Sequence, residues 1–189
     1  MVNLLRSLRF LVVSVVLLGL IYPLVITGIG QLVFPYQANG SMVKVNGTVV
    51  GSELIAQSVT NPGLFHYRPS AVNYAANDSG GSNLGPTNPA LIKEIQTNIQ
   101  VVEQQNPGTP VSSIPPDMVE SSASGLDPDI SIQDAMIQIA RISKATGLSQ
   151  QELTSLVNQY KQSRVLGIWG APMVNVMKLN LAIEKRLGR

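Results

Sequence analysis

The chain has 189 residues, with 13 Lys and Arg against 11 Asp and Glu, no cysteine and a single histidine, His66. The lack of cysteine excludes disulfides, thiol catalysis and thiolate metal sites, and one histidine cannot build the usual multi-histidine metal centre. The nearly balanced charge, without a basic stripe, predicts no nucleic-acid binding.

An uncharged apolar run covers residues 10–34. As a helix it is about 37 Å long at about 1.5 Å per residue, and the hydrocarbon core of a bilayer is roughly 30 Å thick. The run therefore predicts a transmembrane helix. A cleaved signal peptide is the alternative, but its apolar region is about 7–15 residues long. Pro23 is expected to kink or loosen the helix, and small residues offer faces to a neighbouring helix: Ser14, Gly19, Thr27, Gly28 and Gly30.

Charges beside the span predict its orientation. Arg6 and Arg9 precede it, and the next base is Lys44. The positive-inside bias places residues 1–9 in the cytoplasm and residues 35–189 outside the cell membrane. These roughly 150 outer residues are enough for one compact soluble domain.

The outer domain begins with a predicted hairpin. Residues 42–45 and 48–50 are β-formers and flank Asn46-Gly47, a strong hairpin signal. Gly51-Ser52 then predicts the cap of a short helix over residues 53–57. Residues 58–90 are rich in turn residues and predict a long loop. Its aromatic residues favour an ordered loop, since disordered segments rarely carry them.

A helix is predicted to start at Thr87 or Asn88, with Pro89 in its first turn. Helical spacing puts five apolar residues on one inward face: Leu91, Ile92, Ile95, Ile99 and Val102. Prolines between residues 107 and 116 predict an extended crossing segment. Residues 120–131 are polar and predict turns.

Two further helices follow with clear caps. Ser131, with Asp134 three residues on, predicts a helix to about Ala145 that Gly147 stops. Ser149 and Glu152 form a capping box for the next helix, whose inward residues are Leu153, Leu156, Val157 and Tyr160. The two helices form a predicted helical hairpin.

The C-terminal part predicts a short strand over residues 174–176. Residues 179–183 are ambiguous between strand and helix, and a terminal helix is favoured. The predicted fold is thus α+β: a single N-terminal transmembrane helix followed by one compact extracytoplasmic domain with a small sheet and a helical hairpin.

The loop over residues 65–89 is the predicted partner surface, because it combines aromatic side chains, an arginine and rigid Pro/Gly turns. Amides of a Gly-Gly pair could also cradle an anion, although an ordinary turn is the favoured interpretation. The candidate residues of this loop are Phe65, Tyr67, Arg68, Ser70, Ser79, Gly80, Gly81, Ser82 and Asn83.

Four motifs behind the N-terminal span carry a resemblance. They are FHYRPSA (65–71), SGGSNLGPTNP (79–89), SGLDPDIS (124–131) and VNVMKLNLAI (174–183). In this order they resemble KdpC, the C-chain family of the high-affinity potassium-transporting ATPases. The family usually has His where Asp129 stands, so any role tied to that histidine is in doubt here.

The resemblance implies a non-catalytic accessory subunit of a four-part potassium pump in the cell membrane. Its implied partners are a channel-like potassium-translocating subunit, a P-type ATP-hydrolysing subunit and a small stabilising peptide, besides membrane lipid. The implied roles are assembly and a catalytic-chaperone effect that raises the ATP affinity of the hydrolysing subunit. ATP is therefore a possible ligand by resemblance. Ser79-Gly80-Gly81 is similar to the LSGGQ signature of ABC transporters, but Asp78 and Ser82 replace its Leu and Gln.

Two other interpretations stay open. A membrane-anchored envelope hydrolase could use a serine with His66, although no G-x-S-x-G, Walker A or G-x-G-x-x-G motif is present. A stand-alone anchored binding module is the other. The predicted orientation also places residues 79–89 on the side away from cytoplasmic ATP.

Overall fold

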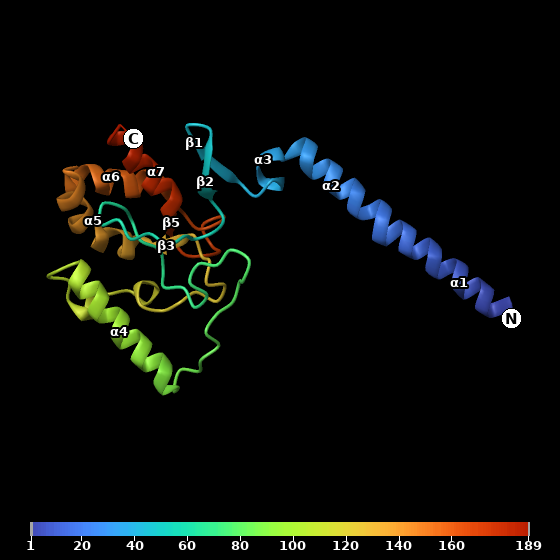
Figure 1. Ribbon diagram of the computed structural model, residues 1–189, viewed down its shortest axis with the longest axis horizontal. Coiled ribbons are helices and arrows are strands. Elements are labelled where there is room, and N and C mark those ends of the chain that lie inside the picture. The colour runs from blue at the N-terminus through green and yellow to red at the C-terminus, as the bar shows by residue number, and fades with distance from the viewer. Residues whose placement is uncertain (1, 189) are drawn as a thin grey trace. The chain divides into compact units, whose positions relative to one another are not determined.

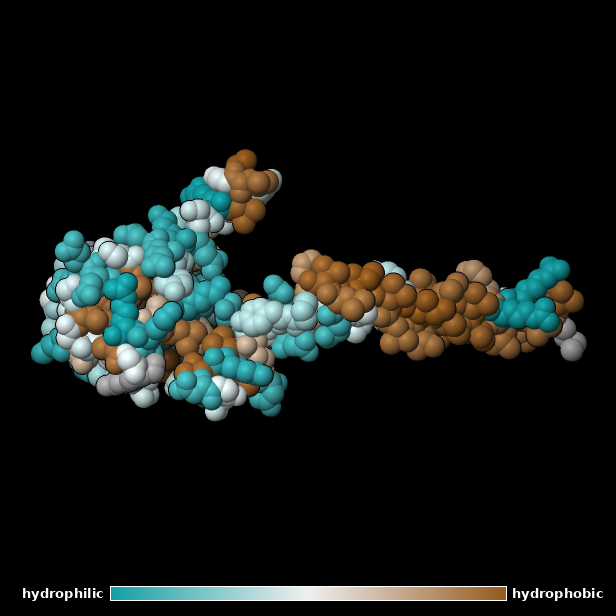
Figure 2. Space-filling view, turned by 90° about the horizontal axis from the view of Figure 1, so that it is seen from above, coloured by the Kyte–Doolittle hydropathy of each residue, from teal (hydrophilic) through white to brown (hydrophobic). Residues whose placement is uncertain are grey.

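The computed structural model describes residues 2–188, and the chain divides into two compact units, Met1–Val50 and Gly51–Arg189. The first unit contains a helix over Val2–Val33 that is long and apolar enough to cross a membrane. It consists of α1 (Val2–Ser14), a π-helical segment η1 (Val15–Ile21) and α2 (Tyr22–Val33). Its surface is apolar along most of its length (Figure 2).

The π-helical segment lies directly before Pro23. Proline has no N–H and its ring clashes with the carbonyl of the preceding turn, and a local π adjustment accommodates both defects. The helix continues without a sharp bend (Figures 1 and 2). The predicted effect of Pro23 therefore appears as a loosened turn and not as a kink.

After α3 (Pro35–Ala38) the predicted hairpin is confirmed as β1 (Met42–Val45) and β2 (Thr48–Ser52). Asn46 and Gly47 both have positive φ angles, 50° and 81°, as a two-residue hairpin turn requires. The predicted helix over residues 53–57 is wrong. The chain turns there instead, and the Ala56 amide donates to Leu126 O at 2.9 Å, away from any helical partner.

The second unit is built on a three-stranded antiparallel sheet in the order β3-β5-β4. Its strands are β3 (Asp129–Ser131), β4 (Lys161–Gln162) and β5 (Met173–Asn175). The predicted strand at residues 174–176 is confirmed with a shift of one residue. Ile130 pairs with Val174 at the centre of the sheet, and both are buried.

The three C-terminal helices follow the predicted pattern and group together in Figure 1: α5 (Ile132–Thr146), α6 (Gln150–Tyr160) and α7 (Val176–Arg186). Ser131 Oγ accepts from the Asp134 amide at 3.0 Å, and Gly147 ends α5 with a φ of 79°. The capping box of Ser149 and Glu152 is present. The helical hairpin and the terminal helix are thus confirmed.

The core of this unit lies between these helices and the sheet. Its fully buried apolar side chains include Phe65, Ile130, Ile142, Leu153, Leu179 and Ile183. Phe65 comes from the long loop, which otherwise has no helix or strand between residues 58 and 88. The loop is therefore fixed to the domain by its own aromatic side chain.

The helix α4 (Pro89–Gln105) starts at Asn88, whose Oδ1 accepts from the Ala90 amide at 2.9 Å. Its predicted inward face is only partly covered, because Val102 is buried while Ile92 is 46% exposed. The predicted extended segment after α4 is also interrupted. It contains two short 3₁₀ helices, η2 (Val111–Ser113) and η3 (Pro116–Met118), each preceded by a proline in extended conformation.

Candidate functional site

The predicted partner loop divides into buried and exposed parts. Phe65 is fully buried, and Asn180 binds its backbone twice: Oδ1 accepts from Phe65 N at 2.7 Å and Nδ2 donates to Phe65 O at 2.9 Å. Tyr67 is also buried, and burial raises the pKa of its phenol. These two aromatic side chains therefore belong to the domain interior and do not form a partner surface in this conformation.

Arg68 and Ser70 connect the loop to residues 124–128. Arg68 Nη1 lies 3.2 Å from Asp127 Oδ2, and both side chains are partly exposed. Ser70 Oγ donates to Gly125 O at 2.6 Å and accepts from the Tyr74 amide at 2.9 Å. A surface hollow of about 580 Å³ lies here, lined by Arg68, Ser79 and Asp127 among others. Of the predicted candidates, Arg68 and Ser79 therefore share one accessible surface.

The Ser79-Gly80-Gly81 turn packs against the same segment. The Gly80 amide and the Ser79 hydroxyl both donate to Ser124 O, at 2.9 and 3.1 Å. A Cβ at Gly81 would lie 3.0 Å from Ala123 O, so a larger residue would push the two loops apart. Close backbone packing thus explains the glycine at position 81, and the Gly80 amide is already bonded.

The end of this turn is held by its own side chains. Asn83 has a φ of 54° and its Nδ2 donates to Gly81 O at 3.1 Å. Ser82 Oγ accepts weakly from the Leu84 amide at 3.5 Å. Both interactions are local turn contacts.

A buried polar network ties the loop to α5. Gln138 accepts from the His66 amide at 2.8 Å and donates to His66 O at 3.1 Å. Arg141 donates to Gln138 Oε1 at 2.6 Å and to the carbonyls of Pro62 and Leu64. The His66 ring lies 3.1 Å from Asn61 O and 3.4 Å from Arg141 Nη1, and burial and Arg141 lower its pKa.

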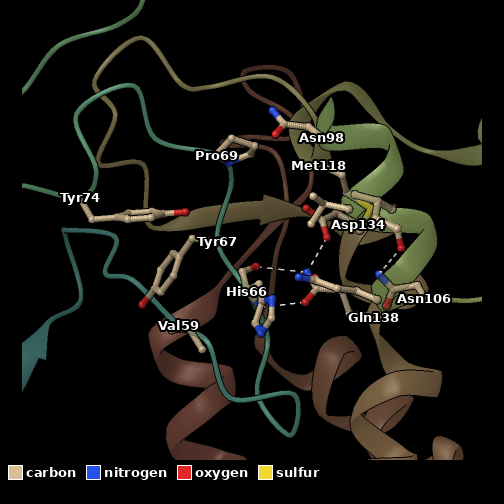
Figure 3. A pocket seen from close by; sticks show the side chains of 13 residues that line it. Val59, His66, Tyr67, Pro69, Tyr74, Asn98, Asn106, Met118, Asp134 and Gln138 are labelled. Atoms are coloured by element: carbon tan, nitrogen blue, oxygen red, sulfur yellow. Dashed lines mark hydrogen bonds between the residues drawn. The ribbon is translucent and has the colours of Figure 1, made fainter. Parts of the chain in front are cut away.

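Beside this network lies a cavity of about 260 Å³ (Figure 3). It is bounded by the loop, the C-terminal half of α4 and the first turns of α5. Asp134 is 1% exposed, and its Oδ1 accepts from Gln138 Nε2 at 2.6 Å. Sequence reasoning missed this site, because Asp134 follows a capping serine and was assigned only to the helix start.

An exposed apolar turn is the second feature that sequence reasoning missed. Val165, Leu166, Ile168 and Trp169 are between 61% and 80% exposed. Val165 and Trp169 exchange both backbone hydrogen bonds, at 2.9 and 3.1 Å, and Leu166 adopts a φ of 52°. The apolar run VLGIWG just after Arg164 was the available sequence signal.

Comparison with known proteins gives the family. The family model described as "KdpC: K+-transporting ATPase, c chain" matches residues 4–185. This chain belongs to the KdpC family. A Potassium-transporting ATPase KdpC subunit from Caldanaerobacter subterraneus subsp. tengcongensis is 49% identical over 182 residues, which cover 96% of this chain and 94% of the relative. A KdpC subunit from Rhodospirillum rubrum is 48% identical over 172 residues, 90% and 89% of the two chains.

Family membership confirms the resemblance seen in the motifs. The chain is a KdpC-family subunit of a potassium-transporting ATPase. Family membership and the apolar helix Val2–Val33 together indicate that the chain associates with a membrane.

Proposed function

We propose that this chain is a non-catalytic accessory subunit that assembles an ATP-driven potassium import complex. Its partners in the proposal are a channel-like potassium-translocating subunit, a P-type ATP-hydrolysing subunit and a small stabilising peptide. Membership in a family of K⁺-transporting ATPase subunits supports the complex. The apolar helix of the first unit supports anchoring beside other membrane helices.

The observation that carries the assembly role is the exposed turn over residues 165–169. Large apolar side chains on a rigid turn are costly to leave in water and are typical of interface anchors. The backbone pairing between Val165 and Trp169 holds the turn before any partner arrives, which lowers the entropy lost on binding. Lys161 and Arg164 are exposed just before it and favour an acidic rim on the partner.

The proposed topology keeps residues 1–9 in the cytoplasm, residues 10–34 in the membrane and residues 35–189 outside. Arg6 and Arg9 support this orientation. In that arrangement the outer domain does not meet cytoplasmic ATP. The effect on ATP affinity that the family resemblance implies would then pass through the assembled subunits, and the bonded Gly80 amide gives no support to an anion cradle at residues 79–83.

The hydrolase alternative has little support from the geometry. A serine nucleophile needs a hydrogen bond to its base. The polar contacts of the His66 ring are with Asn61 O, Arg141 and the side chain of Gln105, and no serine hydroxyl is bonded to the ring within residues 2–188. An adjacent guanidinium also disfavours the protonated histidine that such catalysis forms.

The test is co-purification from native membranes, with mass spectrometry of the recovered subunits. The variant is Leu166→Asn, because asparagine tolerates the positive φ angle at this position. We expect several-fold lower recovery of the partner subunits, with unchanged thermal melting of the purified chain. The matched control is Val111→Ser, which removes an exposed apolar side chain outside the turn. Full recovery with Leu166→Asn would remove the turn from the interface.

A further inference from the structure

The carboxyl of Asp134 lacks an adjacent counter-charge, although it is buried. Its side-chain hydrogen bond in the described structure comes from the neutral amide of Gln138. A buried carboxylate without a cation is strongly unfavourable, so such a group is neutralised by a proton or by a positive ligand.

Neither of the two nearby arginines lines the cavity, and their terminal nitrogens are engaged elsewhere, although the buried Nε of each has no hydrogen-bond partner among residues 2–188. Arg68 Nη1 pairs with Asp127, and both terminal nitrogens of Arg141 donate to carbonyl oxygens or to Gln138. Each contributes only a longer-range field at Asp134. A group that neutralises the negative charge of Asp134 would therefore have to bind inside the cavity.

A second acceptor on the same wall is unsatisfied. Asn106 is buried, its Nδ2 donates to Val102 O at 3.1 Å, and its Oδ1 has no hydrogen-bond partner among residues 2–188. Two amide donors of the lining are used, since Gln138 Nε2 donates to His66 O and to Asp134, and Asn98 Nδ2 donates to Val119 O. Among the residues that line the cavity, an unpaired amide oxygen beside a buried carboxyl group favours a positively charged occupant.

The rest of the lining fits a small cation. Tyr67 and Tyr74 also line the cavity, with ring centroids 6.5 Å apart, and aromatic faces attract cations. A volume of about 260 Å³ holds an ion together with several water molecules. One carboxylate neutralises one unit charge, and no group of three or more acidic, His or Cys ligands occurs in the described part of the chain.

We propose that the cavity between α4, α5 and the long loop binds a small monovalent cation, an alkali ion or ammonium, through Asp134 and Asn106. Figure 3 shows Asp134 and Gln138 meeting at the cavity, with Asn106 on the same side from the end of α4. The site is independent of the exposed turn at residues 165–169. It gives the domain a means of responding to the concentration of the ion around it.

The electrostatics of Asp134 are consistent with this site. Burial raises the pKa of Asp134 to about 8, with Asp117 adding to the rise and Gln138, Arg141 and Arg68 opposing it. A proton and a cation therefore compete for the same carboxyl. Of the other titratable groups that line the cavity, His66 has a lowered pKa and Tyr67 and Tyr74 have raised ones, so these three side chains stay neutral at neutral pH.

The test measures rubidium tracer binding by equilibrium dialysis on the purified full chain in detergent, with choline chloride holding ionic strength constant. We expect one rubidium ion per chain, displaced by potassium and ammonium, and tighter binding at about pH 9 than at about pH 6. Unlabelled potassium and ammonium are added in separate experiments, and the ion that displaces rubidium at the lower concentration is the preferred one.

Asp134→Asn keeps an oxygen for Gln138 and removes the charge, and it should weaken binding at least about tenfold. Glu120→Gln removes an exposed acid and should leave binding unchanged. If Asp134→Asn fails to fold, Asn106→Ala replaces it and should weaken binding at least about threefold. Undiminished binding in the folded variant, or binding without saturation in the wild type, would refute the site. The assay uses no other subunit, so its failure leaves the assembly proposal intact.

Discussion

At the level of single residues, buried amides fix the long loop. Asn180 in α7 bonds both backbone groups of Phe65, and Gln138 in α5 does the same for His66. Each amide thus replaces a strand partner for a segment that lies in no sheet. The loop is ordered for this reason as well as for its aromatic content.

Arg68 gives a prediction at this level. Arg68→Ala should weaken pump assembly or activity more than Lys161→Ala, because Arg68 borders the hollow at residues 122–128. Lys161 is the first residue of β4 and is exposed. Partly exposed ion pairs such as Arg68–Asp127 are typically worth about 0–1 kcal/mol, so melting should change little.

Melting of the purified chain and co-purification of the subunits separate the two possible roles of Arg68. Unchanged melting with lost assembly supports an interface. A large melting drop that accounts for the whole loss would show that Arg68 only stabilises its own domain.

At the level of elements, local signals predicted most helices and the hairpin. Ser131, Gly147 and the Ser149–Glu152 box act within one turn of each helix, so their effect could be predicted from the sequence. β3 and β4 could not, because two- and three-residue strands exist only through pairing with distant β5.

The same reasoning explains why the burial of the candidate loop residues could not be predicted. Phe65 and Tyr67 resembled interface anchors in sequence, but both are buried in the core with apolar residues of α5, α6 and α7. The hydrogen-bonding partners of Phe65 and His66 lie 115 and 72 residues away along the chain. No local pattern reveals such contacts.

The contact between the loops 79–83 and 122–128 gives a prediction for an element. Gly125 has a φ of 66°, and a Cβ there would lie 2.8 Å from Gly80 O. Gly125→Ala should therefore destabilise the domain by about 1–3 kcal/mol, from strain and from separation of the loops.

Thermal or denaturant unfolding of the full chain in detergent measures this loss. Gly85→Ala is the matched control, since a Cβ at Gly85 meets no atom within 4 Å, and it should change stability by less than about 0.5 kcal/mol. Equal stability of the two variants would contradict the role assigned to Gly125.

For the whole molecule, the two units have different surroundings in the proposal: a bilayer for residues 10–34 of the first unit and water for the second unit, Gly51–Arg189. The topology prediction belongs to this level. A reporter fused to the C-terminus, active on only one side of the membrane, should report an outer location. The same reporter at the N-terminus should report the cytoplasm, because Arg6 and Arg9 are retained there.

A cytoplasmic signal from the C-terminal reporter would reverse the orientation. It would also make direct contact of the domain with ATP plausible again.

The π-helical turn before Pro23 has a geometric consequence for the membrane helix. Each residue in a π-helix advances around the axis by a smaller angle than in an α-helix, because its hydrogen bonds span one residue more. The seven residues Val15–Ile21 therefore rotate α2 out of phase with α1. Ser14 and the later group of Thr27, Gly28 and Gly30 do not lie along the line that a regular helix would give them. The small-residue faces predicted on the two halves therefore point in different directions, and a neighbouring helix aligned with one half is not aligned with the other.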